Sequence, residues 1–356
     1  MNTHLSDIEL IKTTLQSNSI AASETKLDGN FIDKYFEILN YTNEFDEIAL
    51  AVFKFQYHHC KVYHDYVDGL GKNISSINSV EKIPFLPISF FKTHDVISSN
   101  QSPQIEFRSS GTTGIVQSRH LVTDKSIYLQ SMINCFHQSF DKVNDYCFLA
   151  LLPSYLEKNN SSLVYMVEEL MKISNHPKNG FYLYNHEDLY NTLLALESAH
   201  QKTILIGVTY ALLDFAEKYN PQLNHTIVLE TGGMKGRRKE WLKHEVHDYL
   251  NKAFNKKSIA SEYGMTELLS QFYAIKNGVF SMQKTAKVWI RDLYDPFQIS
   301  KNIGETGCLN IVDLSNINSC SFIATDDIGK ITTKNSFEII GRVDYSDVRG
   351  CNLMIN

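Results

Sequence analysis

The middle of the chain alternates between helical and strand-like patterns, and this alternation restricts the fold more than any other feature. Apolar side chains at three- and four-residue spacing predict helices over residues 125–140, 161–173, 187–200, 210–218 and 238–254. Short apolar and β-branched runs predict strands at 147–152, 181–184, 203–208, 226–230 and 258–261. Strands that alternate with helices in this way form parallel neighbours. We therefore expect an α/β fold with a mostly parallel, doubly wound sheet.

The two ends of the chain follow other patterns. Helices are predicted over residues 5–16, 31–39 and 45–66, and glycines at 69 and 71 end the third. Beyond Ser270, short strands are predicted at 287–291, 307–312, 321–324 and 337–340, which indicates a smaller β-rich C-terminal subdomain. The predicted division is a helical N-terminal part of the large domain (1–83), an α/β core (84–269), and the β-rich subdomain with its tail (270–356).

Composition excludes several classes of protein. The net charge of −6 gives no bulk attraction for nucleic acid or anionic lipid. The longest apolar stretch, 203–216, contains Gly207, Thr209 and Asp214 and is too polar for a transmembrane segment, and no leader opens the chain. The 6 cysteines include no C-x-x-C pair, so reduced thiols are expected. We expect a cytoplasmic protein with no nucleic-acid partner.

A hydroxyl-rich loop follows the strand-like residues 105–108. It consists of Ser109, Ser110, Gly111, Thr112, Thr113 and Gly114. The glycines let the backbone approach an anion, and the amides and hydroxyls can donate to its oxygens, so the loop is suited to holding phosphates. No Gly-Lys-Ser/Thr ends it, so it is not a Walker loop. A polar surface turn is the alternative, and the loop alone leaves both interpretations open.

Four further motifs follow in a fixed order. They are Thr231-Gly232-Gly233-Met234-Lys235-Gly236-Arg237-Arg238, Tyr263-Gly264-Met265-Thr266-Glu267, Thr325-Asp326-Asp327-Ile328-Gly329 and Gly341-Arg342-Val343-Asp344. Together with the hydroxyl loop, this series resembles that of the adenylate-forming ligases, which join a carboxylate to AMP before passing the acyl group to a thiol.

Within that superfamily, the chain is most similar to the LuxE-type acyl-protein synthetases. The resemblance rests on the hydroxyl loop, on the first and second of these four motifs, and on two further segments, Pro84-Phe85-Leu86-Pro87-Ile88 with Phe91-Lys92 and Asp347-Val348-Arg349-Gly350-Cys351-Asn352. It extends from about Pro84 to the C-terminus. It implies that the α/β core binds nucleotide and acyl group, with ATP and Mg²⁺ as cofactors.

The resemblance also implies roles for single residues. The hydroxyl loop would hold the departing phosphates, Glu267 would be the magnesium carboxylate and Thr266 would place a hydroxyl on the α-phosphate. Tyr263, followed by Gly264, would pack its ring against adenine. For Tyr263, the alternative is a tyrosine that packs in the core. For Glu267, the alternative is an acidic residue at a helix start, where the helix dipole favours it.

In the third and fourth motifs, Asp327 corresponds to the family aspartate that accepts hydrogen bonds from both ribose hydroxyls. Arg342 corresponds to the arginine that contacts the nucleotide. The usual Thr-Gly-Asp here reads Thr-Asp-Asp, and the extra carboxylate, Asp326, leaves a second candidate. For Asp327, the alternative is an acidic residue that caps a turn beside a glycine. For Arg342, the alternative is a surface salt bridge.

Gly232 and Gly233 resemble the family loop beside the adenine and acyl pocket. The cations that follow, Lys235, Arg237, Arg238 and Lys239, fall where a helix is predicted to begin. Each would cost about 0.3–1 kcal/mol at that position, which predicts a compensating anion: a phosphate, a substrate carboxylate or the acidic face of a partner. Four solvated charges are the alternative. Lys235 is the candidate catalytic cation.

The chain stops at Asn356, soon after Arg342, so the mobile C-terminal lid of most adenylate-forming ligases, with its catalytic lysine, is expected to be missing. Cys351 corresponds to the cysteine on which acyl-protein synthetases carry the acyl group, and the neighbouring Arg349 would favour its reactive thiolate. A small buried thiol without chemistry is the alternative.

The sequence thus predicts an enzyme that activates a fatty or related carboxylic acid and transfers the acyl group through a thioester to a partner protein, such as an acyl reductase or an acyl carrier protein. An acyl-CoA or acyl-carrier-protein ligase is a second hypothesis. A non-catalytic nucleotide-binding subunit is a third.

Overall fold

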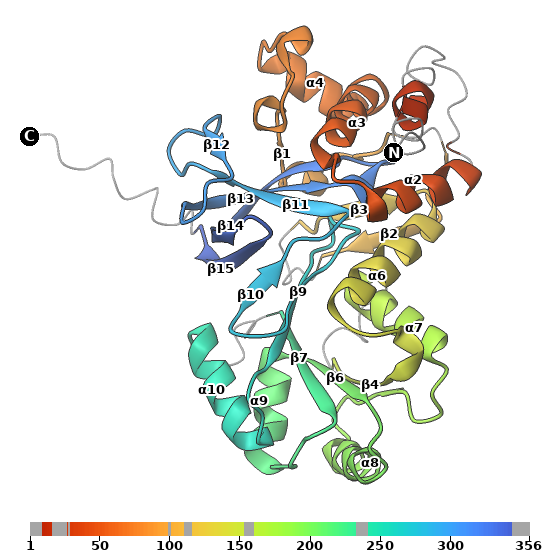
Figure 1. Ribbon diagram of the computed structural model, residues 1–356, viewed down its shortest axis with the longest axis vertical. Helices are drawn as coiled ribbons and strands as arrows, with labels where there is room; N and C mark the ends of the chain where they lie inside the picture. Colours follow the sequence, from red (N-terminus) through yellow and green to blue (C-terminus); the bar gives the residue numbers. More distant parts are fainter. Residues whose placement is uncertain are drawn as a thin grey trace, which may run out of the picture.

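A computed structural model describes residues 9–15, 27, 29–98, 101–109, 116–152, 160–232 and 241–343. The molecule is elongated (Figure 1): helices and parallel strands from the middle of the chain form one end, and the N-terminal helices with the C-terminal strands form the other. Among the described residues, no helix is both long and apolar enough to cross a membrane.

Residues 9–15 are helical, and the further helices follow in chain order. They are α2 (Gly29–Tyr41), α3 (Phe45–His59), α4 (Lys61–Gly69), α5 (Phe90–Thr93), α6 (Lys125–Ser139), α7 (Ser162–Ser174), α8 (His186–Ser198), α9 (Thr209–Lys218) and α10 (Lys243–Phe254). Short 3-10 turns lie at Ile74–Ser76, Val80–Lys82, Val143–Asp145 and Leu314–Asn316.

The strands fall into a short N-terminal set, a central parallel set and a C-terminal antiparallel set. The first two sets are β1 (Leu86–Pro87), β2 (Ile105–Arg108), β3 (Arg119–Val122), β4 (Cys147–Leu151), β5 (Gly180–Phe181), β6 (Thr203–Val208), β7 (Thr226–Thr231) and β8 (Ala260–Tyr263). The third is β9 (Phe272–Ala274), β10 (Val279–Ser281), β11 (Ala286–Arg291), β12 (Ile299–Ser300), β13 (Thr306–Asp313), β14 (Phe322–Thr333) and β15 (Ser336–Arg342).

The parallel part of the sheet has the order β5–β4–β6–β7–β8. The central strands β4 and β6 are fully buried, as expected for strands covered by helices on both faces. The predicted α/β fold with a largely parallel doubly wound sheet is therefore confirmed.

The C-terminal strands continue the same sheet. β9 pairs antiparallel with β8, and the order runs on through β10, β15, β14, β13, β11 and β12. Together with β1, which pairs with β14 outside this order, they make one mixed sheet of 13 strands. The predicted β-rich C-terminal part is confirmed, and its strands bring residues near 327 and 342 beside the end of β8.

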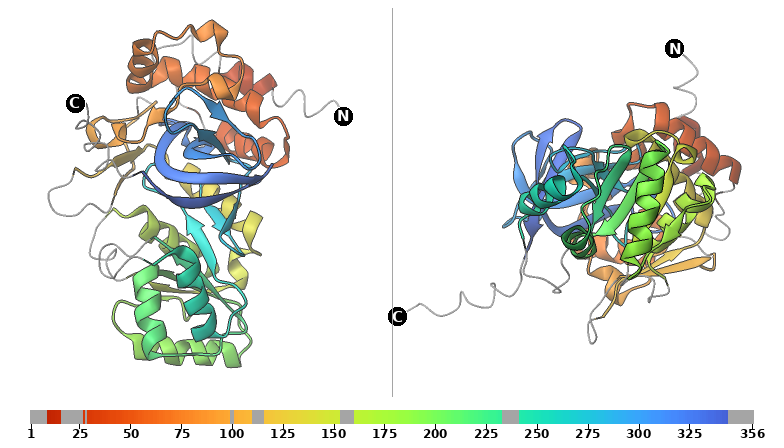
Figure 2. Two further views of the ribbon diagram at one scale, coloured as in Figure 1. Left: turned by 90° about the vertical axis from the view of Figure 1, so that its left-hand side faces the viewer. Right: turned by 90° about the horizontal axis from the view of Figure 1, so that it is seen from below.

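The N-terminal helices pack on this β-rich end (Figure 2). Gln56 is fully buried, and its amide donates to the carbonyl oxygens of Asn316 and Ile317 at 2.8 and 3.0 Å. β1 pairs in parallel with β14 through Leu86. Segments more than 200 residues apart in sequence thus share one core. The domain boundaries given above stay a prediction.

Two predicted helices differ from those observed. The helix predicted over 45–66 is two helices, because Cys60 has extended backbone angles (φ −96°, ψ 99°). The helix predicted to begin at Arg238 begins at Lys243, where the Glu245 side chain accepts a 2.7 Å hydrogen bond from the Leu242 backbone N–H. The cations between 235 and 239 lie outside the described residues, so the anion predicted to compensate them stays a prediction.

Candidate active site

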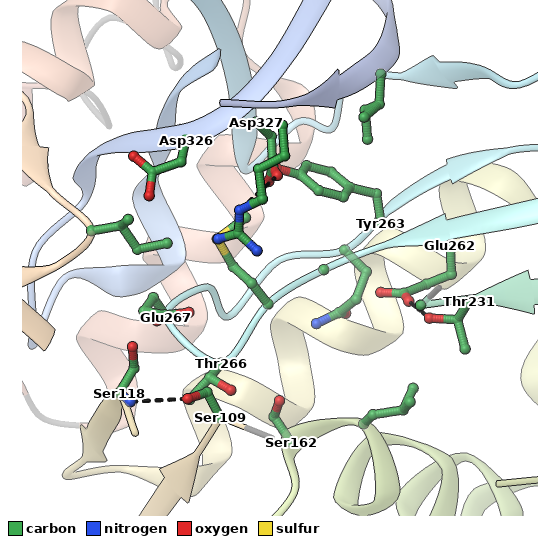
Figure 3. A pocket seen from close by; sticks show the side chains of 18 of the residues that line it. Ser109, Ser118, Ser162, Thr231, Glu262, Tyr263, Thr266, Glu267, Asp326 and Asp327 are labelled. Carbon is green, nitrogen blue, oxygen red and sulfur yellow. Dashed lines mark hydrogen bonds and ion pairs between the residues drawn. The ribbon is translucent and has the colours of Figure 1, made fainter. Parts of the chain in front are cut away.

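A cavity of about 860 Å³ opens where the parallel strands end. Its walls come from the carboxyl ends of β7 and β8, the start of α7, and strands β14 and β15. The crevice beyond the carboxyl ends of parallel strands is where open α/β sheets bind ligands. Figure 3 shows the polar side chains that converge on this space from both halves of the sheet.

Tyr263, Asp327 and Arg342 form one polar group of the wall. The Tyr263 hydroxyl donates to Asp327 Oδ2 at 2.7 Å, and Arg342 Nε lies 3.7 Å from Asp327 Oδ1. Asp327 and Arg342 are register partners in the β14–β15 ladder. Burial raises the pKa of Asp327 above its ordinary value, although Tyr263 and Arg342 both favour the carboxylate. A carboxylate held in this way has hydrogen-bonding capacity left for a ligand.

The segment after β8 carries Thr266 and Glu267, with exposed fractions of 9% and 5%. Asn316 Nδ2 donates to the Glu267 backbone carbonyl at 2.8 Å, which fixes this segment against the C-terminal strands. Burial raises the pKa of the Glu267 carboxyl, while a hydrogen bond from Ser118 opposes that rise. On the same side, the Ser118 backbone N–H donates to Ser109 Oγ at 2.9 Å (Figure 3).

His120 lies directly behind this segment. Its Nδ1 is 2.8 Å from the Thr266 carbonyl oxygen, and the ring is 1% exposed. Burial lowers the pKa of His120 to about 4, so the imidazole is neutral near pH 7. Because a carbonyl only accepts, Nδ1 must carry the proton and donate. His120 therefore positions the Thr266 backbone.

Two glutamates stand at the other end of the cavity. Glu230 accepts from Thr209 Oγ1 at 2.6 Å and from Ser261 Oγ at 3.1 Å, and the ammonium of Lys243 is 3.9 Å away. Despite burial, these groups together with His247 hold the pKa of Glu230 below its ordinary value.

Glu262 differs from Glu230. Its carboxyl accepts from the Thr231 hydroxyl, and burial raises its pKa to about 7. This end of the cavity thus pairs a glutamate whose ionised form is stabilised with one whose protonated form is favoured by burial.

Comparisons with known proteins identify the family and the fold of this chain. A family model described as "Acyl-protein synthetase, LuxE" matches residues 20–356. The chain belongs to the LuxE acyl-protein synthetase family. The predicted resemblance is therefore confirmed, and membership supports an acid ligase activity.

A curated relative, the long-chain-fatty-acid–luciferin-component ligase of Vibrio harveyi, is 24% identical over 346 residues, covering 87% of this chain and 86% of that protein. Among solved structures, a 2-hydroxyisobutyryl-CoA ligase in complex with an acyl-AMP superposes with a TM-score of 0.64 at 12% identity, covering 84% of this chain and 68% of that one. A luciferase-like enzyme from the mealworm Zophobas morio gives a TM-score of 0.50 at 14% identity, covering 77% and 62%. At such identities the structures show a shared fold, that of the adenylate-forming ligases.

In this LuxE-family chain, the cavity brings together the predicted site residues that the structure describes. All of them line it: Ser109, Gly232, Tyr263, Gly264, Thr266, Glu267, Asp327 and Arg342. The remaining candidates lie outside the described residues: Ser110, Gly111, Thr112, Thr113, Gly114, Gly233, Lys235 and Cys351. Asp326 and Asp327 both line the cavity, and the hydrogen bond from Tyr263 distinguishes Asp327.

Sequence reasoning missed Ser118, His120, Glu262 and Lys243. Glu262 precedes Tyr263 directly, and strand alternation would have placed it on the opposite face of β8, but nothing local indicates that this face borders a cavity. Lys243 was not recognised as a residue at a helix start, because the helix was predicted to begin five residues earlier, at Arg238. His120 gives no sequence signal, since its partner is a backbone carbonyl 146 residues away.

Proposed function

We propose that this protein activates a fatty or related carboxylic acid with ATP and Mg²⁺ as an acyl-adenylate, and that it transfers the acyl group through a thioester to a partner protein. The observation that carries the proposal is the shared cavity. The Tyr263–Asp327–Arg342 group, the Thr266–Glu267 segment and Ser109 line one space that is large enough for a nucleotide and an acid.

In the first step, an oxygen of the substrate carboxylate bonds to the α-phosphorus of ATP, and the bond to the bridging oxygen breaks to release pyrophosphate. Negative charge on the phosphate oxygens must be met by fixed donors. We assign the Thr266 hydroxyl to the α-phosphate and the Ser109 loop to the leaving phosphates. Asp327 would accept from the ribose hydroxyls, and Arg342 would oppose the phosphate charge.

Glu267 is the residue that would hold Mg²⁺. No group of three or more metal-ligating side chains occurs in the described part of the chain. A single buried carboxylate fits a magnesium ion that enters with the nucleotide, because Mg²⁺ commonly takes one or two carboxylates and completes its shell with phosphates and water. The bound ion supplies neutralising charge. The carboxyl, whose pKa burial raises, would become an ionised ligand.

In the second step, we assign Cys351 as the acyl carrier. Its thiolate attacks the carbonyl carbon of the acyl-adenylate, a carbon–sulfur bond forms, and AMP leaves with the electron pair of the broken carbon–oxygen bond. A thiol of the acceptor, an acyl reductase or an acyl carrier protein, would then take the acyl group. The family membership and the position of Cys351 in Arg349-Gly350-Cys351 support this assignment.

The experiment separates the two steps. Acid-dependent exchange of pyrophosphate into ATP reports adenylation, and hydroxylamine-labile labelling of the chain by radioactive acid plus ATP reports the thioester. Cys351→Ser should keep exchange and lose labelling, whereas the neighbouring control Asn352→Ala should keep both.

Absence of exchange with every acid in a broad panel would refute the adenylation step. Labelling that persists in Cys351→Ser would place the carrier elsewhere. Efficient transfer to coenzyme A without labelling of the wild-type chain would favour the acyl-CoA ligase hypothesis.

A further inference from the structure

The face of the sheet that carries Thr231 and Glu262 is separate from the face that carries Tyr263. In the parallel β7–β8 ladder, Thr231 pairs with Glu262 and Glu230 pairs with Ser261, so the two pairs point to opposite faces. The Glu230 pair faces α9 and α10, through Thr209 and His247. The Glu262 pair therefore faces the other side.

The cavity extends along that side. Its lining there includes Tyr128 of α6 and Ser162, Leu163 and Met166 of α7. The Tyr128 hydroxyl donates to the Ser162 carbonyl at 3.2 Å. Tyr263 and Asp327, which we assign to the nucleotide, lie across the pocket from Ser162 (Figure 3), so this branch is the space left for the acid chain.

Glu262 lines the cavity, and its two oxygens have different surroundings. Oε2 accepts from Thr231. Oε1 lies over Gly264, only 2.5 Å from the position that a Cβ on Gly264 would occupy, and the Gln271 Cγ is 3.6 Å from the same position. Any side chain at 264 would displace this carboxyl. Gly264 thus leaves the room in which Glu262 and Gln271 converge.

Gln271 supplies the second observation. It lines the cavity, is 4% exposed, and its Oε1 has no hydrogen-bond partner among the described residues. Its Nε2 donates to the Leu269 carbonyl at 3.2 Å, which fixes the orientation of the amide because a carbonyl accepts only from the NH₂ group. A buried acceptor without a donor is costly, and buried polar groups are nearly always satisfied.

We propose that the acid activated at this site carries a hydrogen-bond donor on its chain, a hydroxyl or an amino group, which binds between Glu262 and Gln271. The inference rests on the proposed function and specifies its substrate class. A plain alkyl chain in this branch would leave the already buried Gln271 oxygen without a donor and would cover Oε1 of Glu262, whereas a donor on the chain offers a hydrogen bond to these two oxygens. Glu262 and Gln271 are then specificity-determining residues.

The test measures kcat/KM for pyrophosphate exchange with acids matched in carbon number, from about four to fourteen carbons, each supplied unsubstituted, hydroxylated and aminated at several positions. The best donor-bearing acid should exceed its unsubstituted partner by at least about tenfold in the wild-type enzyme. Glu262→Leu and Gln271→Leu should each reduce that ratio toward one. Glu37→Leu, an exposed control on α2, should leave it unchanged.

Glu262→Gln covers the case in which the leucine variant does not fold. It keeps the shape and one acceptor, so it should retain preference for a hydroxyl and lose preference for an ammonium, which distinguishes the two donors. Unsubstituted acids that equal or exceed their partners in the wild-type enzyme would overturn the inference and leave the proposed function standing. A preference that survives in both leucine variants would also overturn it. If no acid supports pyrophosphate exchange, both the inference and the proposed function are overturned.

Discussion

The Tyr263 hydroxyl donates to the Asp327 carboxylate at 2.7 Å, and this bond joins the end of β8 to β14 across 64 residues of sequence. The ring of Tyr263 packs against Phe280 and Phe337 of the C-terminal strands. The continuous sheet therefore holds the Tyr263 ring and the Asp327 carboxylate in a fixed relation, on which the proposed nucleoside site depends.

Tyr263→Phe tests this relation. The aromatic packing remains while Asp327 loses a buried donor, so we expect the free energy of unfolding to fall by about 1 kcal/mol. The KM for ATP in pyrophosphate exchange should rise by roughly threefold to tenfold. Tyr294→Phe, whose side chain is 95% exposed, is the matched control. An unchanged KM in the Tyr263 variant would remove this bond from nucleotide binding.

The two adjacent aspartates should behave differently. Asp327→Asn leaves a neutral side chain between Tyr263 and Arg342, and we expect kcat/KM for ATP to fall at least about tenfold. Asp326→Asn should have a clearly smaller effect, because Tyr263 and Arg342 both contact Asp327. The measurement is exchange at varied ATP concentration. A larger loss in the Asp326 variant would reverse the assignment.

Glu267→Gln should reduce exchange by about tenfold to a hundredfold, the scale of one lost transition-state charge contact. Stability should change little, since burial already raises the pKa of this carboxyl and a neutral amide fits the same space. Titration with MgCl₂ should show a higher magnesium requirement than in the wild-type protein. Normal exchange at the normal magnesium concentration would exclude Glu267 as the metal carboxylate.

Glu262 should make stability depend on pH. Burial raises its pKa from 4.5 to about 7, so between these values the folded state keeps a proton that the unfolded state releases. The free energy of unfolding from this group therefore falls as pH rises from about 4.5 to 7, by up to about 3 kcal/mol. Denaturant unfolding at several pH values should show that Glu262→Gln lacks this decrease. Parallel curves for variant and wild type would contradict it.

His120 should make the free energy of unfolding change with pH in the opposite direction. Its pKa is lowered by burial from 6.5 to about 4, so the unfolded state takes up a proton first as pH falls through this window, and stability is lost. His120→Asn keeps a donor for the Thr266 carbonyl, so it should retain exchange and lose this acid sensitivity. His120→Ala should also lose exchange, because it frees the Thr266 backbone. His244→Asn, an exposed site on α10, is the control.

The sequence alone determined the fold class and the family to which the chain belongs. Both depend on local information: helix and strand periods, and short runs such as Tyr263-Gly264-Met265-Thr266-Glu267, in which residue type and order carry the chemistry. The start of α10 at Lys243 escaped this reasoning, because a capping contact of Glu245 decided it rather than the periodicity.

Only the tertiary structure decided which side chains meet. The merging of the C-terminal strands with the parallel sheet places Asp327 against Tyr263, and the β7–β8 register turns Glu262 away from both. The convergence of Glu262 and Gln271 over Gly264 depends on a hairpin and on the space that one missing Cβ leaves. Such relations arise from strand pairing and packing between segments that are distant in sequence. A local sequence pattern carries no information about these contacts.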